Sequence, residues 1–157
     1  MLLDDGLAGE NDDDTAVKSS REVNDQLQNL GFLIAHDKCQ WSPCQKLDWL
    51  GYSWDTKNGI IFVKEERIQK LAKYFTYALC QVEKGKILFR VRFLASIVGQ
   101  LISMHGVISD TVRQSTRFLY DCALGRISWQ ACVRLTQDVL TELSFWDMHC
   151  KVLNSKG

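Results

Sequence analysis

The stretch that decides the fold is Lys46–Val63, KLDWLGYSWDTKNGIIFV. Aromatic and β-branched residues dominate it, and Asn58-Gly59 is a dipeptide typical of a tight hairpin turn. A similar segment, Phe32–Trp41 (FLIAHDKCQW), precedes it and is separated from it by Ser42-Pro43. These segments predict a set of short antiparallel strands, with Asn58-Gly59 closing one hairpin.

Helices are expected on both sides of these strands. Asp14 or Thr15 is placed to cap a helix that runs to about Leu30 and ends at Gly31. Beyond Val63 the apolar residues recur at helical spacing to the end of the chain. The expected helices cover about 68–82, begin at about Arg90, run from Ser109 or Asp110 to Gly125, and cover about 135–154. The fold class predicted is therefore α+β, a small antiparallel sheet followed by a helical region.

Composition narrows the class of protein. The chain has 157 residues, 46% of them hydrophobic, and a single proline, which is typical of a folded, helix-rich protein. No apolar run approaches the roughly 18–20 residues that span a bilayer, and the N-terminus lacks the pattern of a signal peptide. The six cysteines form no CxxC pair. We therefore expect reduced thiols in a cytoplasmic or nuclear protein without a membrane partner.

The formal net charge of zero hides an uneven distribution. Residues 1–59 carry 5 Lys and Arg against 11 Asp and Glu, whereas residues 60–134 carry 12 against 5. An acidic first part favours cation binding, and a basic middle favours a polyanionic partner. Ordinary solvated helix faces explain the same numbers equally well.

The first residues, MLLDDG, place two adjacent carboxylates, Asp4 and Asp5, after a short apolar run. Taken alone, the pair favours two solvated N-terminal acids. The order of motifs along the whole chain says more. It runs from apolar-Asp-Asp-Gly-Leu through a helix to LGFLIAHDKC, LDWLGYSW and GIIFV, and it ends in helices and ELSFWDMHCKVLN.

This order resembles the C-terminal part of the polymerase region of a reverse transcriptase, as found in DIRS-like and related retroelements. The resemblance implies a palm remnant in residues 1–63, a helical thumb in 64–134, and a connection segment in 135–157 toward a ribonuclease H domain. It implies RNA-directed DNA polymerase chemistry, which is magnesium-dependent nucleotidyl transfer from a deoxynucleoside triphosphate to a template–primer duplex, RNA–DNA or DNA.

The catalytic residues implied by the resemblance are Asp4, Asp5 and Lys38. Two-metal polymerases hold magnesium with carboxylates, and Asp4 and Asp5 correspond to the aspartates of the catalytic hairpin. Lys38 corresponds to a lysine near the triphosphate, although an exposed strand lysine explains it equally well. Leu2 stands where the family usually has tyrosine. The family's first catalytic aspartate and its fingers come earlier in the sequence, so we expect this chain to be inactive alone and Met1 to be a start codon within a longer ancestral frame.

Two further segments correspond to nucleic-acid contacts of the family. Trp49, Leu50, Gly51 and Tyr52 match the primer-grip hairpin, whose alternative role is aromatic packing between palm and thumb. In the thumb helix, small residues recur every fourth position, an arrangement that permits close approach to a minor groove but is also typical of helix–helix packing. The residues involved are Ala95, Gly99 and Ser103, with Arg90, Arg92 and Gln100 placed to reach phosphates or polar edges. Lys64, Arg67, Lys70 and Lys73 would add nonspecific phosphate attraction.

Other kinds of site have weaker support. His36, Cys39 and Cys44 form an H-x2-C-x4-C pattern, but no second close pair of ligands follows to complete a structural zinc site. The histidines are scattered, so no serine or cysteine nucleophile has a placed partner. The main alternative to a polymerase fragment is a non-catalytic nucleic-acid-binding or helical interaction module. Unpaired strand edges also predict poor solubility.

Overall fold

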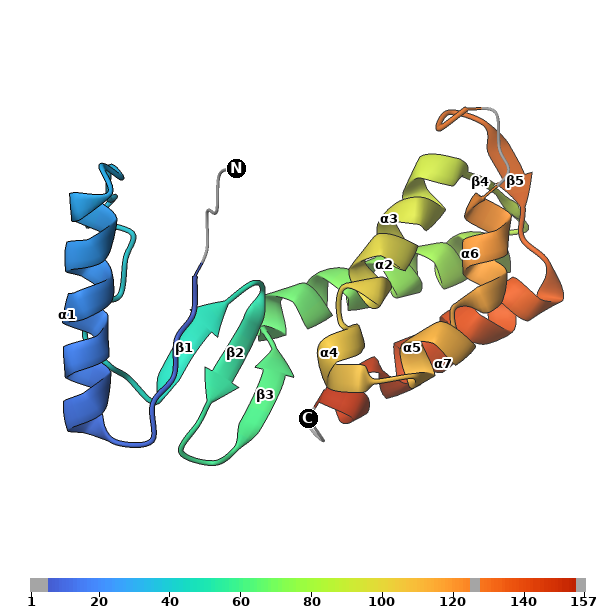
Figure 1. The fold of residues 1–157 in the computed structure, drawn as a ribbon. Helices are drawn as coiled ribbons and strands as arrows, with labels where there is room; N and C mark the ends of the chain where they lie inside the picture. Colours follow the sequence, from blue (N-terminus) through green and yellow to red (C-terminus); the bar gives the residue numbers. More distant parts are fainter. Residues whose placement is uncertain (1–5, 125–127, 155–157) are drawn as a thin grey trace.

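The computed structural model describes residues 6–124 and 128–154. Figure 1 shows a helix at one end of the molecule, a small sheet in the middle and a body of helices at the other end. The predicted α+β class is confirmed. The elements in chain order are α1 (Asp13–Asn29), β1 (Lys46–Trp49), β2 (Tyr52–Asp55), β3 (Ile60–Val63), α2 (Glu65–Glu83), β4 (Leu88–Arg90), α3 (Val91–Ile102), α4 (His105–Ile108), α5 (Thr111–Gln114), α6 (Arg117–Ala123), β5 (Cys132–Arg134) and α7 (Gln137–Asn154).

The three-stranded sheet follows the predicted hairpins. Its order is β1-β2-β3 and both pairs are antiparallel. Asn58-Gly59 ends the four-residue loop between β2 and β3, because Asp55 pairs with Ile60. The β1–β2 turn contains only Leu50 and Gly51, with φ of 48° and 81°. Two positive φ values are the geometry of a type I′ turn, which matches the twist of the strands that it joins.

The predicted strand over Phe32–Trp41 is wrong. This segment is irregular and contains a turn in which the N–H of Lys38 donates to the carbonyl of Ala35 at 2.9 Å. Two of its apolar side chains face solvent, with Leu33 fully exposed and Phe32 58% exposed. A strand needs ladder hydrogen bonds and cross-strand side-chain contacts, and within the described residues no strand pairs with this segment.

Helix α1 begins earlier than predicted. Asp12, rather than Asp14 or Thr15, is the N-cap, because its carboxylate accepts hydrogen bonds from the N–H and the hydroxyl of Thr15 at 2.8 and 2.7 Å. The predicted end is confirmed: Gly31 has a φ of 82°, and its N–H and that of Phe32 donate back to the last turn. No residue of α1 is buried, so this helix contributes little to the core.

The hydrophobic core lies almost entirely in the helical body, where α2 packs on α7 and α3 packs on α6. The predicted helices α2 and α3 are confirmed, and so is the last helix, although it begins at Gln137 rather than at residue 135. The single helix predicted to start at Ser109 or Asp110 is wrong, because two short helices, α5 and α6, occupy this part of the chain, and the short helix α4 comes just before it. Ser109 has a φ of 63°, which no helix interior accepts. The predicted stop at Gly125 lies outside the described residues.

Side chains from α7 hold the neighbouring elements in place. The amide of Asn154 pairs with both backbone groups of Val63 at the end of β3, accepting from the N–H at 2.8 Å and donating to the carbonyl at 2.9 Å. The buried carboxylate of Glu142 accepts the N–H groups of Phe118 and Leu119 at the start of α6, at 3.0 and 2.8 Å. None of the described helices is long and apolar enough to cross a membrane.

Candidate nucleic-acid interface

Helix α3 buries one face and exposes the other. Val91, Leu94, Ile97, Val98 and Leu101 form the buried face. The outer face carries small or polar residues, which are Arg92, Ala95, Ser96, Gly99, Gln100 and Ser103. Ile102, predicted to be apolar core, is 47% exposed at the end of this helix.

Gly99 faces open space. A Cβ built on it would meet no atom within 4 Å outside its own helix. Helix–helix packing was one of the two explanations for the small residues, and within the described chain no other helix packs on Gly99. Packing against another helix therefore does not explain the glycine at this position.

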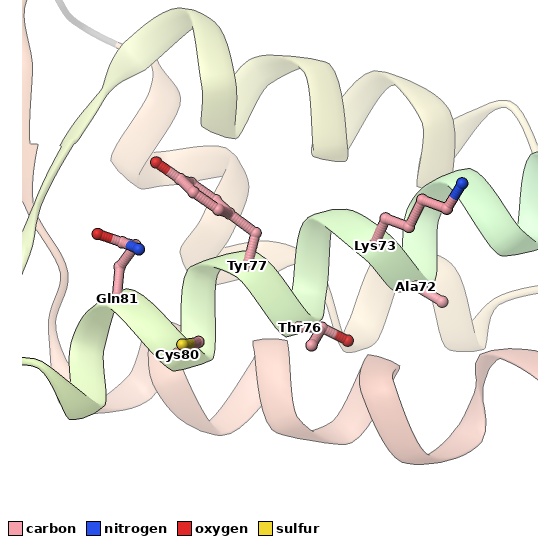
Figure 2. A pocket seen from close by; sticks show the side chains of 6 residues that line it. All are labelled: Ala72, Lys73, Thr76, Tyr77, Cys80 and Gln81. Atoms are coloured by element: carbon pink, nitrogen blue, oxygen red, sulfur yellow. The ribbon is translucent and has the colours of Figure 1, made fainter.

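Helix α2 lies beside α3 and adds positive charge to the same region. The two helices are joined by edge-to-face ring contacts of Phe93 with Tyr74 and Tyr77, with centroids 5.7 and 5.5 Å apart. Lys70 and Lys73 are exposed on α2, and neither forms an ion pair with a described residue. Figure 2 shows Lys73 and Tyr77 pointing toward α3.

A shallow depression of about 460 Å³ lies along α2. Its lining residues, Ala72, Lys73, Thr76, Tyr77, Cys80 and Gln81, all come from this one helix, as Figure 2 shows. Small-molecule sites are usually concave and bury most of their ligand. An open depression on one helix lacks this shape.

The primer-grip candidates lie at the end of α3. Leu50, at the tip of the β1–β2 turn, is 59% exposed. The Arg67 guanidinium donates to the Gly51 carbonyl at 2.9 Å, and the Tyr52 hydroxyl donates to the Ser103 carbonyl at 2.5 Å. The sheet and the helices therefore meet at this turn, which was one of the two roles predicted for the hairpin.

The aromatic residues of the hairpin also pack on each other. Trp49 and Trp54 are half-buried and lie edge to face, with ring centroids 5.9 Å apart. Because Trp49 packs against Trp54, its side chain is partly covered. The exposed part of the four-residue motif is therefore its tip, at Leu50.

The remaining cationic candidates differ in whether their charge is free to bind a phosphate. Arg90, the last residue of β4, and Arg92 in the first turn of α3 are both exposed. Lys64 forms an ion pair with Asp48 at 2.8 Å, which lowers the pKa of that carboxyl and occupies the lysine charge. Arg67 is also engaged, because both of its terminal nitrogens donate to groups within the chain.

Of the three catalytic candidates, the structure describes only Lys38. Asp4 and Asp5 lie outside the described residues, and Lys38 is exposed in the turn that follows α1. Within the described residues, no group of three or more His, Cys, Asp or Glu side chains lies close enough to hold a metal ion. The zinc hypothesis for His36, Cys39 and Cys44 thus has no support from the arrangement of these side chains.

Two buried carboxyl groups have shifted pKa values, and both take part in contacts within the fold and not in this surface. Asp55 is buried beneath the β2–β3 loop, where hydrogen bonds from Lys46 and then from Asn58 lower its pKa to about 2. Glu142 behaves in the opposite way, because burial raises its pKa despite the backbone N–H groups that it accepts.

The sequence did not identify every residue of this surface. Tyr77 and Phe93 were missed, because aromatic residues at helical spacing are usually core. The engagement of Arg67 and Ser103 was also missed, since it depends on a contact between residues 36 positions apart. Comparison with models of known protein families, with curated proteins and with solved structures finds no match to the chain.

Proposed function

We propose that this chain is part of the polymerase region of a retroelement reverse transcriptase and that its described residues bind a template–primer duplex, RNA–DNA or DNA. The contact surface consists of the outer face of α3, Lys70 and Lys73 of α2, and the Leu50-Gly51 tip. We call it the duplex face below.

The observation that carries the proposal is the open, uncharged stripe on α3 around Gly99. A wide, shallow minor groove displays 2′-hydroxyls and base edges, which small polar side chains can approach closely. The 12 residues of α3 span about 18 Å, the length of about five base pairs.

The charges around the stripe fit a polyanion. Lys70 and Lys73 lie on one side, and Arg92 lies at the start of α3. Glu66 lies on the same side of α2 by helical spacing and subtracts one charge. Phosphate contacts position a protein on a duplex without reading its sequence, so binding without sequence preference is expected.

Residues outside the duplex face would carry out the catalytic part of the proposed function. Asp4 and Asp5 would hold magnesium, for which carboxylate oxygens are suitable ligands. Magnesium, when bound, would supply charge stabilisation for nucleotidyl transfer. Lys38 would lie near the triphosphate of the incoming nucleotide. Support for these roles comes from the motif order alone, whereas duplex binding is testable on residues that the structure describes.

The test is the salt dependence of binding to a fluorescently labelled RNA–DNA hybrid, measured by anisotropy. The three cations on the duplex face, Lys70, Lys73 and Arg92, predict a slope of log K against log salt concentration of about −3. Each of Lys70→Gln, Lys73→Gln and Arg92→Gln should make the slope shallower by about 1. Lys18→Gln, an exposed lysine on α1 at the other end of the molecule (Figure 1), is the matched control and should leave the slope unchanged.

Two observations favour the alternative, a helical interaction module. The side of the molecule around α1 has apolar groups without packing, including the fully exposed Leu33. The indole N–H groups of Trp41, Trp49 and Trp54 are buried with no hydrogen-bond partner among the described residues, which is unusual in a finished fold. Undetectable or salt-insensitive hybrid binding would favour this alternative.

A further inference from the structure

Two hydrogen bonds join the β1–β2 hairpin to the helical body, and a third links Arg67 of α2 to Ser103 at the end of α3. One nitrogen of the Arg67 guanidinium donates to the Gly51 carbonyl at 2.9 Å, and the other donates to the Ser103 hydroxyl at 2.5 Å. The Tyr52 hydroxyl donates to the Ser103 carbonyl at 2.5 Å. The Ser103 hydroxyl also donates to the Gln100 carbonyl at 2.7 Å, so this residue is fully engaged at the end of α3.

The packing around these bonds depends on two glycines. A Cβ on Gly51 would lie 2.5 Å from the nearer Arg67 nitrogen, so a larger residue would push the guanidinium aside. A Cβ on Gly106 would lie 3.1 Å from the Tyr52 hydroxyl oxygen. A side chain at either glycine would therefore shift a group that joins the hairpin to the helices.

The backbone conformation of the turn explains why it needs these contacts. Leu50 has a φ of 48°, a conformation that side chains with a Cβ adopt only under constraint. Such strain persists when the surrounding structure holds the backbone, and it is often found at functional sites. The Leu50 side chain at this position is 59% exposed, so burial in the core does not explain the conformation.

We propose that Arg67 is a positioning residue that aligns the Leu50-Gly51 tip with the outer face of α3, so that both contact one duplex at the same time. This inference rests on the proposed duplex binding. Arginine suits the role because its planar guanidinium presents separate N–H groups to two acceptors, one on the turn and one on α3. A lysine keeps the charge but donates from a single nitrogen.

The decisive variant is therefore Arg67→Lys, measured in two ways. Hybrid affinity should fall by about tenfold at fixed salt, while the slope of log K against log salt stays at the wild-type value because no charge is lost. Hydrogen exchange of the backbone amides of Leu50 to Tyr52 should become faster in the free protein. Arg21→Lys, at an exposed position of α1, is the matched control and should change neither quantity.

A direct phosphate contact by Arg67 would give a different pattern. Arg67→Lys would then bind nearly as well as wild type, and Arg67→Gln would reduce the slope by about 1, which would overturn the positioning role. Tyr52→Phe provides a second variant without a charge change. It removes only the bond to the Ser103 carbonyl, and we expect weaker binding with an unchanged slope.

The two measurements separate this inference from the function on which it rests. A wild-type chain that binds no hybrid at low salt would overturn duplex binding and, with it, the alignment role. Unchanged amide exchange of the turn in both Arg67→Lys and Tyr52→Phe would overturn the positioning role alone, even if the wild-type chain binds the hybrid with the expected slope.

Discussion

Replacing Gly51 with alanine tests how the sheet is joined to the helices. The new methyl group would sit at a φ of 81° and 2.5 Å from the Arg67 guanidinium. The positive φ costs an alanine about 1–2 kcal/mol, and the reduced freedom of the unfolded chain returns about 0.4–1 kcal/mol. Displacing the guanidinium from the Gly51 carbonyl costs about 1–1.5 kcal/mol more. The expected loss is therefore about 2 kcal/mol of the free energy of unfolding.

The assay is urea denaturation followed by circular dichroism, with thermal unfolding as a second measurement. For a chain of this size, a loss of about 2 kcal/mol lowers Tm by about 4–8 °C. Gly99→Ala is the matched control with the opposite sign. Gly99 lies in a helix with open space around it, so alanine should stabilise by about 0.8–1 kcal/mol. A Gly51→Ala protein as stable as wild type would refute the reasoning about the turn.

Three other predictions concern buried polar groups. Because the pKa of Asp55 is lowered to about 2, chiefly by the hydrogen bond from Lys46, its ionised form stabilises the fold above about pH 4, and this contribution is lost as the pH falls toward 2. Asp55→Asn should flatten the stability profile in that range, measured by urea denaturation at each pH, and an unchanged profile would contradict the assignment. Burial raises the pKa of Glu142, so the folded state binds that proton more tightly than the unfolded chain, and ionisation above about pH 4.3 reduces stability. Glu142→Ala should nevertheless cost about 2–3 kcal/mol at pH 7, because two N–H groups of α6 lose their acceptor; a Tm equal to wild type would exclude the capping role. Asn154→Asp should destabilise by about 2 kcal/mol, because it places a carboxylate against the Val63 carbonyl and removes the donor, and an unchanged urea midpoint would argue against the pairing.

Local patterns predicted the elements that depend on local physics. Asn58-Gly59 marked the β2–β3 hairpin, and apolar residues at helical spacing located α2 and α3. The strand predicted over Phe32–Trp41 failed because its composition favours a strand but the described chain supplies no partner for it. The small sheet of β4 and β5 was missed for the converse reason, since two three-residue strands leave almost no pattern in the sequence.

The duplex face was only partly predictable. The spacing of Ala95, Gly99 and Ser103 placed them on one side of a helix, but it did not show whether that side was buried. The structure shows that Gly99 is exposed and has open space around it. It also shows that the Ser103 hydroxyl already accepts a hydrogen bond from Arg67. Contacts of this kind link residues distant in sequence and are invisible to periodicity.

The most direct test of duplex binding is the affinity of Gly99→Gln for an RNA–DNA hybrid. Glutamine is a good helix former and uncharged, and open space surrounds this position, so stability should not fall. Thr76→Gln, at an exposed site of α2 that points away from α3 in Figure 2, is the matched control. If α3 lies in the groove, Gly99→Gln should weaken binding by at least about tenfold, or about 1.4 kcal/mol, while Thr76→Gln binds like wild type. A Gly99→Gln protein that binds the hybrid as tightly as wild type would contradict the account.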